Sequence, residues 1–246
     1  MRRLALTPLR GAVLTLSLGA CQPPETLAPV PFSDDFTRAE LGPNWFPSGG
    51  HWTLRDGYAY STGANNAPCF LRAALPKDVV VEVDVHSETA EVDSKIELMT
   101  NGRAHASGYV FIYGGWSNKI SSIARLDEHG ADRKEKKPTN AVGNRTYRWR
   151  IEKKGGSIKW LVDGRPYLSF EDPQPLDGPG HDRLALSNWQ NRVRWDNLKI
   201  WPYADAPPVR TATTTEAVPS TPPVEQDPPP SAAEVVPPTS TAETTP

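Results

Sequence analysis

Residues 146–167 read TYRWRIEKKGGSIKWLVDGRPY, and this stretch decides the fold. Apolar and polar side chains alternate on both sides of Gly155-Gly156, and a second two-residue turn follows at Asp163-Gly164. Strict alternation indicates strands with one buried face, and Gly-Gly or Asp-Gly between two such runs is a strong hairpin signal. The stretch therefore predicts a three-stranded antiparallel meander over residues 146–170.

The same period-two pattern extends over most of the chain, and helical periodicity is nearly absent between residues 31 and 202. Valines alternate with charged residues over 79–86, and a hairpin is predicted over 52–61 around Asp56-Gly57. Further strands are predicted near residues 69–75, 95–101, 107–114, 120–127, 183–189 and 192–201. Ten or eleven strands with short turns predict an all-β fold, a two-sheet antiparallel jelly-roll sandwich.

Aromatic residues mark the extent of the folded part. All eight Trp and all six Phe of the 246 residues lie between Phe32 and Trp201. We therefore expect one domain over residues 32–202, preceded by a Pro-rich extended linker over 21–31. Residues 203–246 hold 11 of the 26 Pro and are otherwise rich in Thr, Ser, Ala and Glu, so a disordered tail is predicted there.

The charge balance excludes one class of partner. The formal net charge is −2, and residues 32–202 taken alone are near neutral. Nucleic-acid binding requires a clear excess of Lys and Arg, so nucleic acid is not expected as a partner.

The N-terminus predicts the compartment. Residues 1–20 begin Met-Arg-Arg and continue into a short apolar run, which is typical of a secretory signal peptide. Leu18-Gly19-Ala20-Cys21 resembles the bacterial lipobox. That resemblance implies lipidation of Cys21 and anchoring in a lipid bilayer by several acyl chains. The alternative is an ordinary signal peptide in which the cysteine is incidental.

The lipobox resemblance has consequences for two further residues, Gln22 and Cys69. In enteric bacteria, Asp directly after the lipidated cysteine retains a lipoprotein in the inner membrane. Gln22 occupies that position here, so the resemblance implies sorting to the outer membrane of a Gram-negative cell envelope, on its periplasmic or surface face. If Cys21 is acylated, Cys69 has no intramolecular partner and is expected to be a small buried hydrophobe.

Motifs at both ends of the domain resemble the concanavalin A-like lectin/glucanase group, which includes laminin G-like and 3-keto-disaccharide hydrolase-type domains. The N-terminal motifs are FSDDF at 32–36, LGPNW at 41–45 and WTLRDG at 52–57. The C-terminal motifs are GPG at 178–180 and VRWDNLKI at 193–200, and GGWSN at 114–118 resembles a turn of related sandwich modules. The resemblance implies a concanavalin A-like sandwich, a fold that hosts lectins, lyases, glycosidases and adhesion modules alike.

The resemblance also implies a calcium site. In such sandwiches the first and last strands pair, which would bring Asp34 or Asp35 close to Asp196. The superfamily often holds calcium there, a cation that prefers carboxylate and backbone oxygens. We therefore take Asp35 and Asp196 as candidate calcium ligands. The alternative is that Asp34 and Asp35 cap a turn while Asp196 pairs with an arginine.

Two short segments combine aromatic and amide side chains, as sugar-binding surfaces do. The candidate carbohydrate-binding residues are Tyr113, Trp116, Asn118, Asn188, Trp189, Gln190, Arg103 and His105. The expected ligand is a saccharide or cell-wall polysaccharide. The alternative is that these indoles belong to the core or to a sheet edge.

One acidic cluster raises the question of catalysis. Glu91, Asp93 and Glu97 resemble the signature of family 16 glycosidases, with a spacing one residue too long. Retaining glycosidases need two carboxyl groups about 5 Å apart, whereas Glu91 and Glu97 would lie roughly 20 Å apart along a regular strand. The sequence therefore favours a carbohydrate-binding lipoprotein without catalysis. A glycoside-acting enzyme and a structural interaction module of the envelope are the alternatives.

Overall fold

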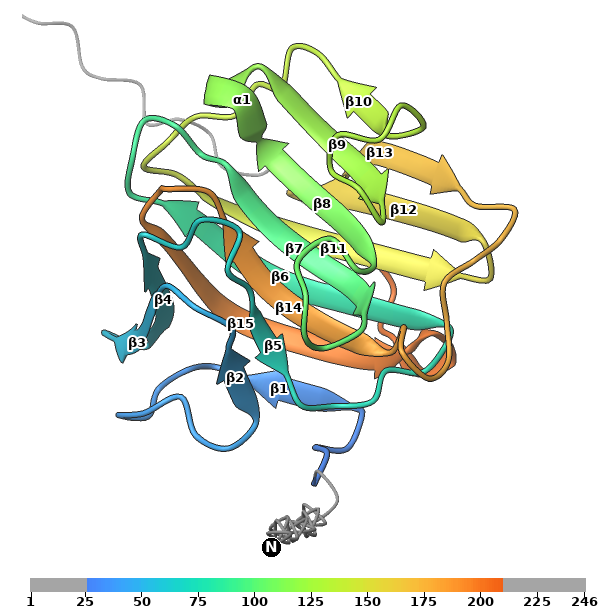
Figure 1. Ribbon diagram of the computed structural model, residues 1–246, viewed down its shortest axis with the longest axis horizontal. Coiled ribbons are helices and arrows are strands. Elements are labelled where there is room, and N and C mark those ends of the chain that lie inside the picture. The colour runs from blue at the N-terminus through green and yellow to red at the C-terminus, as the bar shows by residue number, and fades with distance from the viewer. Residues whose placement is uncertain (1–25, 210–246) are drawn as a thin grey trace, which may run out of the picture. The chain divides into compact units, whose positions relative to one another are not determined.

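A computed structural model describes residues 26–209, which form two antiparallel sheets stacked face to face (Figure 1). The eight-stranded sheet runs in the order β13 (Arg165–Glu171), β12 (Ser157–Val162), β11 (Thr146–Lys154), β6 (Val79–Ser87), β15 (Val193–Pro202), β4 (Tyr58–Thr62) and β3 (His51–Arg55), and β1 (Phe32–Asp34) also pairs with β15. The seven-stranded sheet runs in the order β10 (Lys134–Lys136), β9 (Ile120–Arg125), β8 (Tyr109–Gly114), β7 (Ser94–Thr100), β14 (Arg183–Asn188), β5 (Cys69–Leu71) and β2 (Trp45–Pro47).

The predicted all-β jelly-roll sandwich is confirmed, and so is the meander that decides it. Strands β11, β12 and β13 pair consecutively, as predicted for residues 146–170. Asp163 and Gly164 both have positive φ, 52° and 73°, as the type I′ turn between two twisted strands requires. The hairpin of β3 and β4 turns in the same way at Asp56 and Gly57.

Three strands were not predicted, and each is only three residues long. Strands β1, β2 and β10 are too short to show an alternating pattern. Strand β10 lies in a mixed charge run over 132–137 that reads as a solvent-exposed loop. It forms the edge of the seven-stranded sheet, where charged side chains discourage pairing with another chain.

The two ends of the domain meet, as the resemblance implied. Phe32 pairs with Ile200 and Asp34 with Leu198, so β1 lies alongside β15 (Figure 1).

The contacts of the domain also extend beyond 32–202. Ala28 N donates to Arg72 O, and Tyr203 N, in the short helix η1 (Tyr203–Asp205), donates to Asp78 O. Part of the predicted linker and the start of the predicted tail therefore contact the sandwich.

Aromatic side chains from both sheets fill the space between them. Trp160 is fully buried, and its ring lies 4.8 Å from Trp149, 5.0 Å from Tyr167 and 5.7 Å from Phe111. Cys69 is buried in β5, and burial raises the pKa of its thiol, which makes it a poor nucleophile.

The outer face of the seven-stranded sheet is buried as well, and this positions the candidate site. Lys95 and Glu97 of β7 alternate with the core residues Ile96 and Leu98, yet they are only 2% and 0% exposed. A small apolar cluster of Val110, Ile112 and Ala124 lies on the same outer face, with Ala106 and Trp116 packed against it. The loops that follow β7 and β9 therefore cover this face.

The aromatic core predicts a large and specific loss of stability. Trp160→Ala should lower the free energy of unfolding by about 3–5 kcal/mol, because a buried indole that contacts both sheets is replaced by a cavity. Trp160→Phe should cost clearly less, since it keeps a ring and removes an indole N–H that has no hydrogen-bond partner among the described residues. Chemical denaturation measures both variants, and equal losses would contradict this account of the core.

Candidate functional site

A pocket of about 470 Å³ opens above the outer face of the seven-stranded sheet. Its lining comes from β7, β8 and five connecting segments, so residues far apart in the sequence meet there. The lining residues are Asn66, Glu91, Asp93, Lys95, Ile112, Trp116, Ser117, Glu128, His129, Trp189 and Gln190.

A left-handed turn directs Trp116 to the pocket. The residues after β8 form the short element α1 (Gly115–Asn118), in which Trp116, Ser117 and Asn118 all have φ between 52° and 60°. Gly114, which precedes them, also has positive φ, and a Cβ there would lie 2.8 Å from the Ala141 side chain. Glycine is therefore required at the start of this turn.

Hydrogen bonds and a cation hold the turn and its indole in place. Asn118 Oδ1 accepts a hydrogen bond from Val92 N, and its Nδ2 donates to Ala90 O, both at 2.8 Å. The Arg133 guanidinium lies 4.8 Å from the Trp116 ring centroid, a cation–π arrangement. The orientation of Trp116 is therefore set before any ligand binds.

Trp189 provides the second indole. It follows β14 directly, its side chain is 42% exposed, and its backbone N donates to Asp93 O at 3.4 Å. The next residue, Gln190, has a φ of 56°, and its N donates to Ala64 O. The 63–66 and 188–190 segments thus hold each other beside the pocket.

Charged side chains form the floor of the pocket. The buried Lys95 ammonium donates to Asn66 Oδ1 at 2.6 Å and to Glu128 Oε2 at 2.8 Å, and it lies 3.6 Å from Asp93 Oδ1. Asn66 Nδ2 in turn donates to Glu128 Oε1 at 3.0 Å. One lysine thus links β7 to the loops that carry Asn66 and Glu128.

A second layer of charge lies beneath this floor. His105 Nδ1 lies 2.7 Å from Oε1 of the fully buried Glu97, and Ala106 N donates to Glu97 Oε2. His105 Nε2 lies 3.3 Å from Glu128 Oε2 without the alignment of a hydrogen bond, so that contact is electrostatic. His105 therefore bridges Glu97 and Glu128.

The surroundings move the pKa values of these groups in different directions. Burial raises the pKa of Asp93 to about 6, and Lys95 offsets only part of that effect. Burial lowers the pKa of His105, but its contacts with the carboxylates of Glu128 and Glu97 outweigh that effect and raise the value to about 9. Burial opposes ionisation of Glu128 as well, yet His105 and Lys95 hold its pKa well below the usual range.

Three of the eight predicted carbohydrate-binding residues line this pocket: Trp116, Trp189 and Gln190. His105 lies beneath the floor, and Arg103 is exposed in the loop after β7, outside the lining.

The remaining three candidates have structural positions. Tyr113 is buried in the core, 4.7 Å from the Tyr147 ring. Asn188 is fully buried, accepting from Ser61 Oγ and donating to Asn191 O, and Asn118 holds the left-handed turn. These three do not line the pocket, because the protein itself uses their polar groups or their rings.

Sequence reasoning missed the polar residues of the floor: Asn66, Lys95 and Glu128. The signal for Lys95 was present, because alternate residues of a strand point to the same side, and Lys95 lies in this spacing with residues 91, 93 and 97. Nothing in the sequence indicated that the loops of Asn66 and Glu128 fold over that side.

Comparison with solved structures agrees with this architecture. A carbohydrate-binding module, CBM66 from Bacillus subtilis, matches with a TM-score of 0.56 and 14% identity over 72% of this chain and 99% of the module. The chain has a concanavalin A-like lectin/glucanase fold. No protein-family model and no curated protein matches the sequence.

Two further structures share the concanavalin A-like fold. One belongs to work on endo-acting O-glycanases of human gut microbiota, with a TM-score of 0.52 and 12% identity over 70% of this chain and 98% of the other. The other is a glycosyl hydrolase family protein from Mycobacterium fortuitum, with a TM-score of 0.50 and 12% identity over 69% of this chain and 98% of the other. At these identities the similarity concerns the fold.

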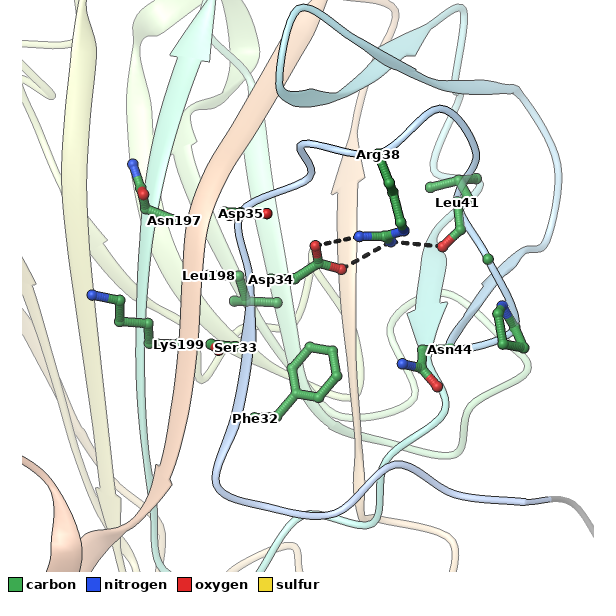
Figure 2. Close-up of a pocket in the computed structure, with 12 residues that line it drawn as sticks. Phe32, Ser33, Asp34, Asp35, Arg38, Leu41, Asn44, Asn197, Leu198 and Lys199 are labelled. Carbon is green, nitrogen blue, oxygen red and sulfur yellow. Dashed lines mark hydrogen bonds and ion pairs between the residues drawn. The ribbon is translucent and has the colours of Figure 1, made fainter.

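Asp35 and Asp196, the calcium ligands that the sequence resemblance implied, do not form a calcium site here. Figure 2 shows the Arg38 guanidinium directed at both carboxylate oxygens of Asp34 and at Leu41 O. Asp35 accepts from Thr37 N and Oγ1, so Asp34 and Asp35 act within turns, as the alternative had it.

Asp196 is near these carboxylates but belongs to another network. Burial and the charges of Asp84, Asp35 and Asp34 raise its pKa, and it accepts from Asn197 rather than from an arginine. Within residues 26–209, no group of three or more His, Cys, Asp or Glu side chains is arranged to hold a metal ion.

The predicted lipidation site, Cys21, lies outside the described residues, as do the signal peptide and most of the tail. In the part of the chain that the structure covers, no helix has the length and hydrophobicity needed to cross a membrane.

The charge layer beneath the pocket predicts a pH dependence of stability. The folded-state pKa of His105, about 9, is above its ordinary value of 6.5, so its contribution is complete below pH 6.5 and is lost as pH rises through 9. His105→Gln should lower the unfolding free energy by up to about 3 kcal/mol at pH 6, and this difference should vanish near pH ~10.

Urea denaturation of the wild type and His105→Gln across that pH range measures this effect. His51→Gln is the matched control, because His51 is exposed on β3. A difference for His105→Gln that stays constant with pH would show that Glu97 and Glu128 do not stabilise the protonated ring.

Proposed function

We propose that this protein binds carbohydrate in the pocket between Trp116 and Trp189. The observation that carries the proposal is the meeting of two indoles and several carboxylate and amide groups in one pocket of about 470 Å³ on a concanavalin A-like sandwich. Ligand pockets commonly combine apolar walls with a few placed polar groups.

The chemistry of the lining suits a sugar. The flat faces of indoles pack against the apolar face of a pyranose, while carboxylate and amide oxygens accept hydrogen bonds from its hydroxyl groups. Trp189 is 42% exposed, and Gln190 and Glu91 beside it are exposed too. These groups are therefore accessible to a polyhydroxylated ligand.

Backbone strain at the pocket supports a binding role. Asn66, Trp116, Ser117 and Gln190 all line the pocket, and each has φ between 52° and 56°. Non-glycine residues in this conformation cost free energy, and such residues cluster at ligand sites.

The arrangement of the carboxylates favours binding over hydrolysis. Asp93 and Glu128 have the contrasting pKa values of an acid and a base, as glycosidases require. However, both carboxylates contact the Lys95 ammonium, at 3.6 and 2.8 Å. The ammonium group thus lies where a glycosidase would place the scissile bond.

Among the solved structures with the same fold are a carbohydrate-binding module and a glycosyl hydrolase family protein. Their names support a carbohydrate ligand for this chain. The proposal also includes the localisation predicted from the sequence, a lipid anchor at Cys21 in the cell envelope.

The indoles predict the outcome of substitution. On a glycan array, and in calorimetry with the glycans that score, Trp189→Ala should reduce affinity at least about tenfold, or ~1.4 kcal/mol, because the sugar loses a stacking face. Trp116→Ala should act in the same direction.

Phe46→Ala is the matched control for these variants. Phe46 is 43% exposed on β2 and lies outside the lining, so its removal should leave affinity unchanged. Glycan binding that survives both Trp116→Ala and Trp189→Ala would exclude this pocket as the site, and a domain that binds none of the arrayed glycans would refute the function.

The lipid anchor predicts a covalent change at one residue. Expression of the full chain in a Gram-negative host with labelled palmitate should label the protein in the membrane fraction, because acylation needs the Cys21 thiol. Cys21→Ser should abolish the label, whereas Cys69→Ser should retain it. Release of unlabelled wild-type protein into the soluble fraction would contradict the lipobox interpretation.

A further inference from the structure

The pocket has an excess of hydrogen-bond acceptors and negative charge. Its lining contains three carboxylates, those of Glu91, Asp93 and Glu128. Lys95 is the one lysine or arginine in the lining formed by the described residues. A ligand therefore meets a net negative surface.

The single cation of the lining is fully used by the protein. The Lys95 ammonium donates hydrogen bonds to Asn66 and Glu128, and its charge lies 3.6 Å from the Asp93 carboxylate without a hydrogen bond. A carboxylate, sulfate or phosphate on a ligand would meet three carboxylates without a free cation to pair with.

The neighbouring basic side chains already have partners as well. Arg133, beside Trp116, donates from Nε to Glu135 Oε1 at 2.7 Å and from Nη1 to Glu128 O at 2.8 Å, and its Nη2 also pairs with Glu135. His129 Nε2 lies 3.5 Å from Glu128 Oε1. The Arg133 guanidinium and the His129 ring thus already face acceptors of the protein.

One acceptor in the pocket lacks a donor. Asp93 Oδ1 is buried, and among residues 26–209 it has no hydrogen-bond partner, because Lys95 Nζ stays 3.6 Å away. Lys95 thus compensates the charge of the Asp93 carboxylate only in part, and because the Asp93 side chain as a whole is 14% exposed, a cation on a ligand can approach it from the pocket. The Trp189 indole of the same lining, 42% exposed, favours a cation in addition through its ring face.

We propose that the pocket selects saccharides that carry a free, protonated amine, with the ammonium group placed against the Trp189 indole and paired with Asp93. This specificity rests on the proposed function. An amino sugar should bind more tightly than the same sugar with a hydroxyl or an N-acetyl group in place of the free amine. Uronic and sialic acids should have the lowest affinity.

Three tetrasaccharides with one type of backbone linkage test the selection: the β-1,4 tetramer of glucosamine, its fully N-acetylated form, and cellotetraose. Affinities are measured by calorimetry at pH ~6.5. An amine with the pKa of an ordinary α-amino group is largely protonated at this pH, and much of Asp93 is ionised. The glucosamine tetramer should bind at least about tenfold more tightly than the other two, and higher salt should reduce that preference.

Substitutions assign the preference to the pocket. Asp93→Asn should abolish the preference for the amine, and Glu91→Gln, at an exposed position, should reduce it. Asp56→Asn is the matched control: its carboxylate is 78% exposed in the β3–β4 turn, outside the lining, so the preference should persist. Thermal unfolding of each variant checks that it is folded.

The outcomes separate this inference from the proposed function. Equal affinities for the three tetramers, with binding that still depends on Trp189, would overturn the amine selection and leave carbohydrate binding intact. Binding of tetralysine as tightly as the glucosamine tetramer would also overturn it, since the attraction would then be to any polycation. If none of the three tetramers and no arrayed glycan binds, both proposals fail.

Discussion

The burial of the Lys95 ammonium is the constraint around which the loops of the candidate site are arranged. A charge on the outer face of a sheet is normally solvated, but Lys95 is only 2% exposed. A buried ammonium group requires acceptors and opposite charge, and here Asn66 and Glu128 accept its hydrogen bonds while the Asp93 carboxylate lies 3.6 Å away. The segments that carry them are thereby tied to β7, and the pocket lies between them.

The fold was largely predictable because its determinants are local. Alternation over 146–170 and turn residues such as Asp163-Gly164 indicate strands and hairpins without reference to the rest of the chain. The three strands that were not predicted have only three residues each and exist through their partners, as β1 does along β15. Their pairing is a long-range property that no short window of sequence contains.

The candidate site was predictable only in part, because its residues are joined by loops. Trp116 and Trp189 were found because indoles beside amides form a local pattern. Tyr113, from the same pattern, faces the core, and its parity with Phe111 in β8 already indicated this. Glu128 is not among the candidate site residues of the sequence analysis, because its hydrogen bond to Lys95 spans 33 residues and no local pattern indicates it.

Stability alone does not account for this arrangement. Apolar residues of similar volume often stabilise a fold as well as a buried cluster of charges does, or better, because desolvation of the charges costs several kcal/mol per ion. Here that cost is combined with left-handed backbone at Asn66, Trp116 and Gln190 and with an unsatisfied oxygen on Asp93. All of these unfavourable features surround one pocket. A ligand that donates hydrogen bonds to Asp93 would offset part of the cost, which is why the strain and the charge of this pocket point to binding rather than to support of the sandwich.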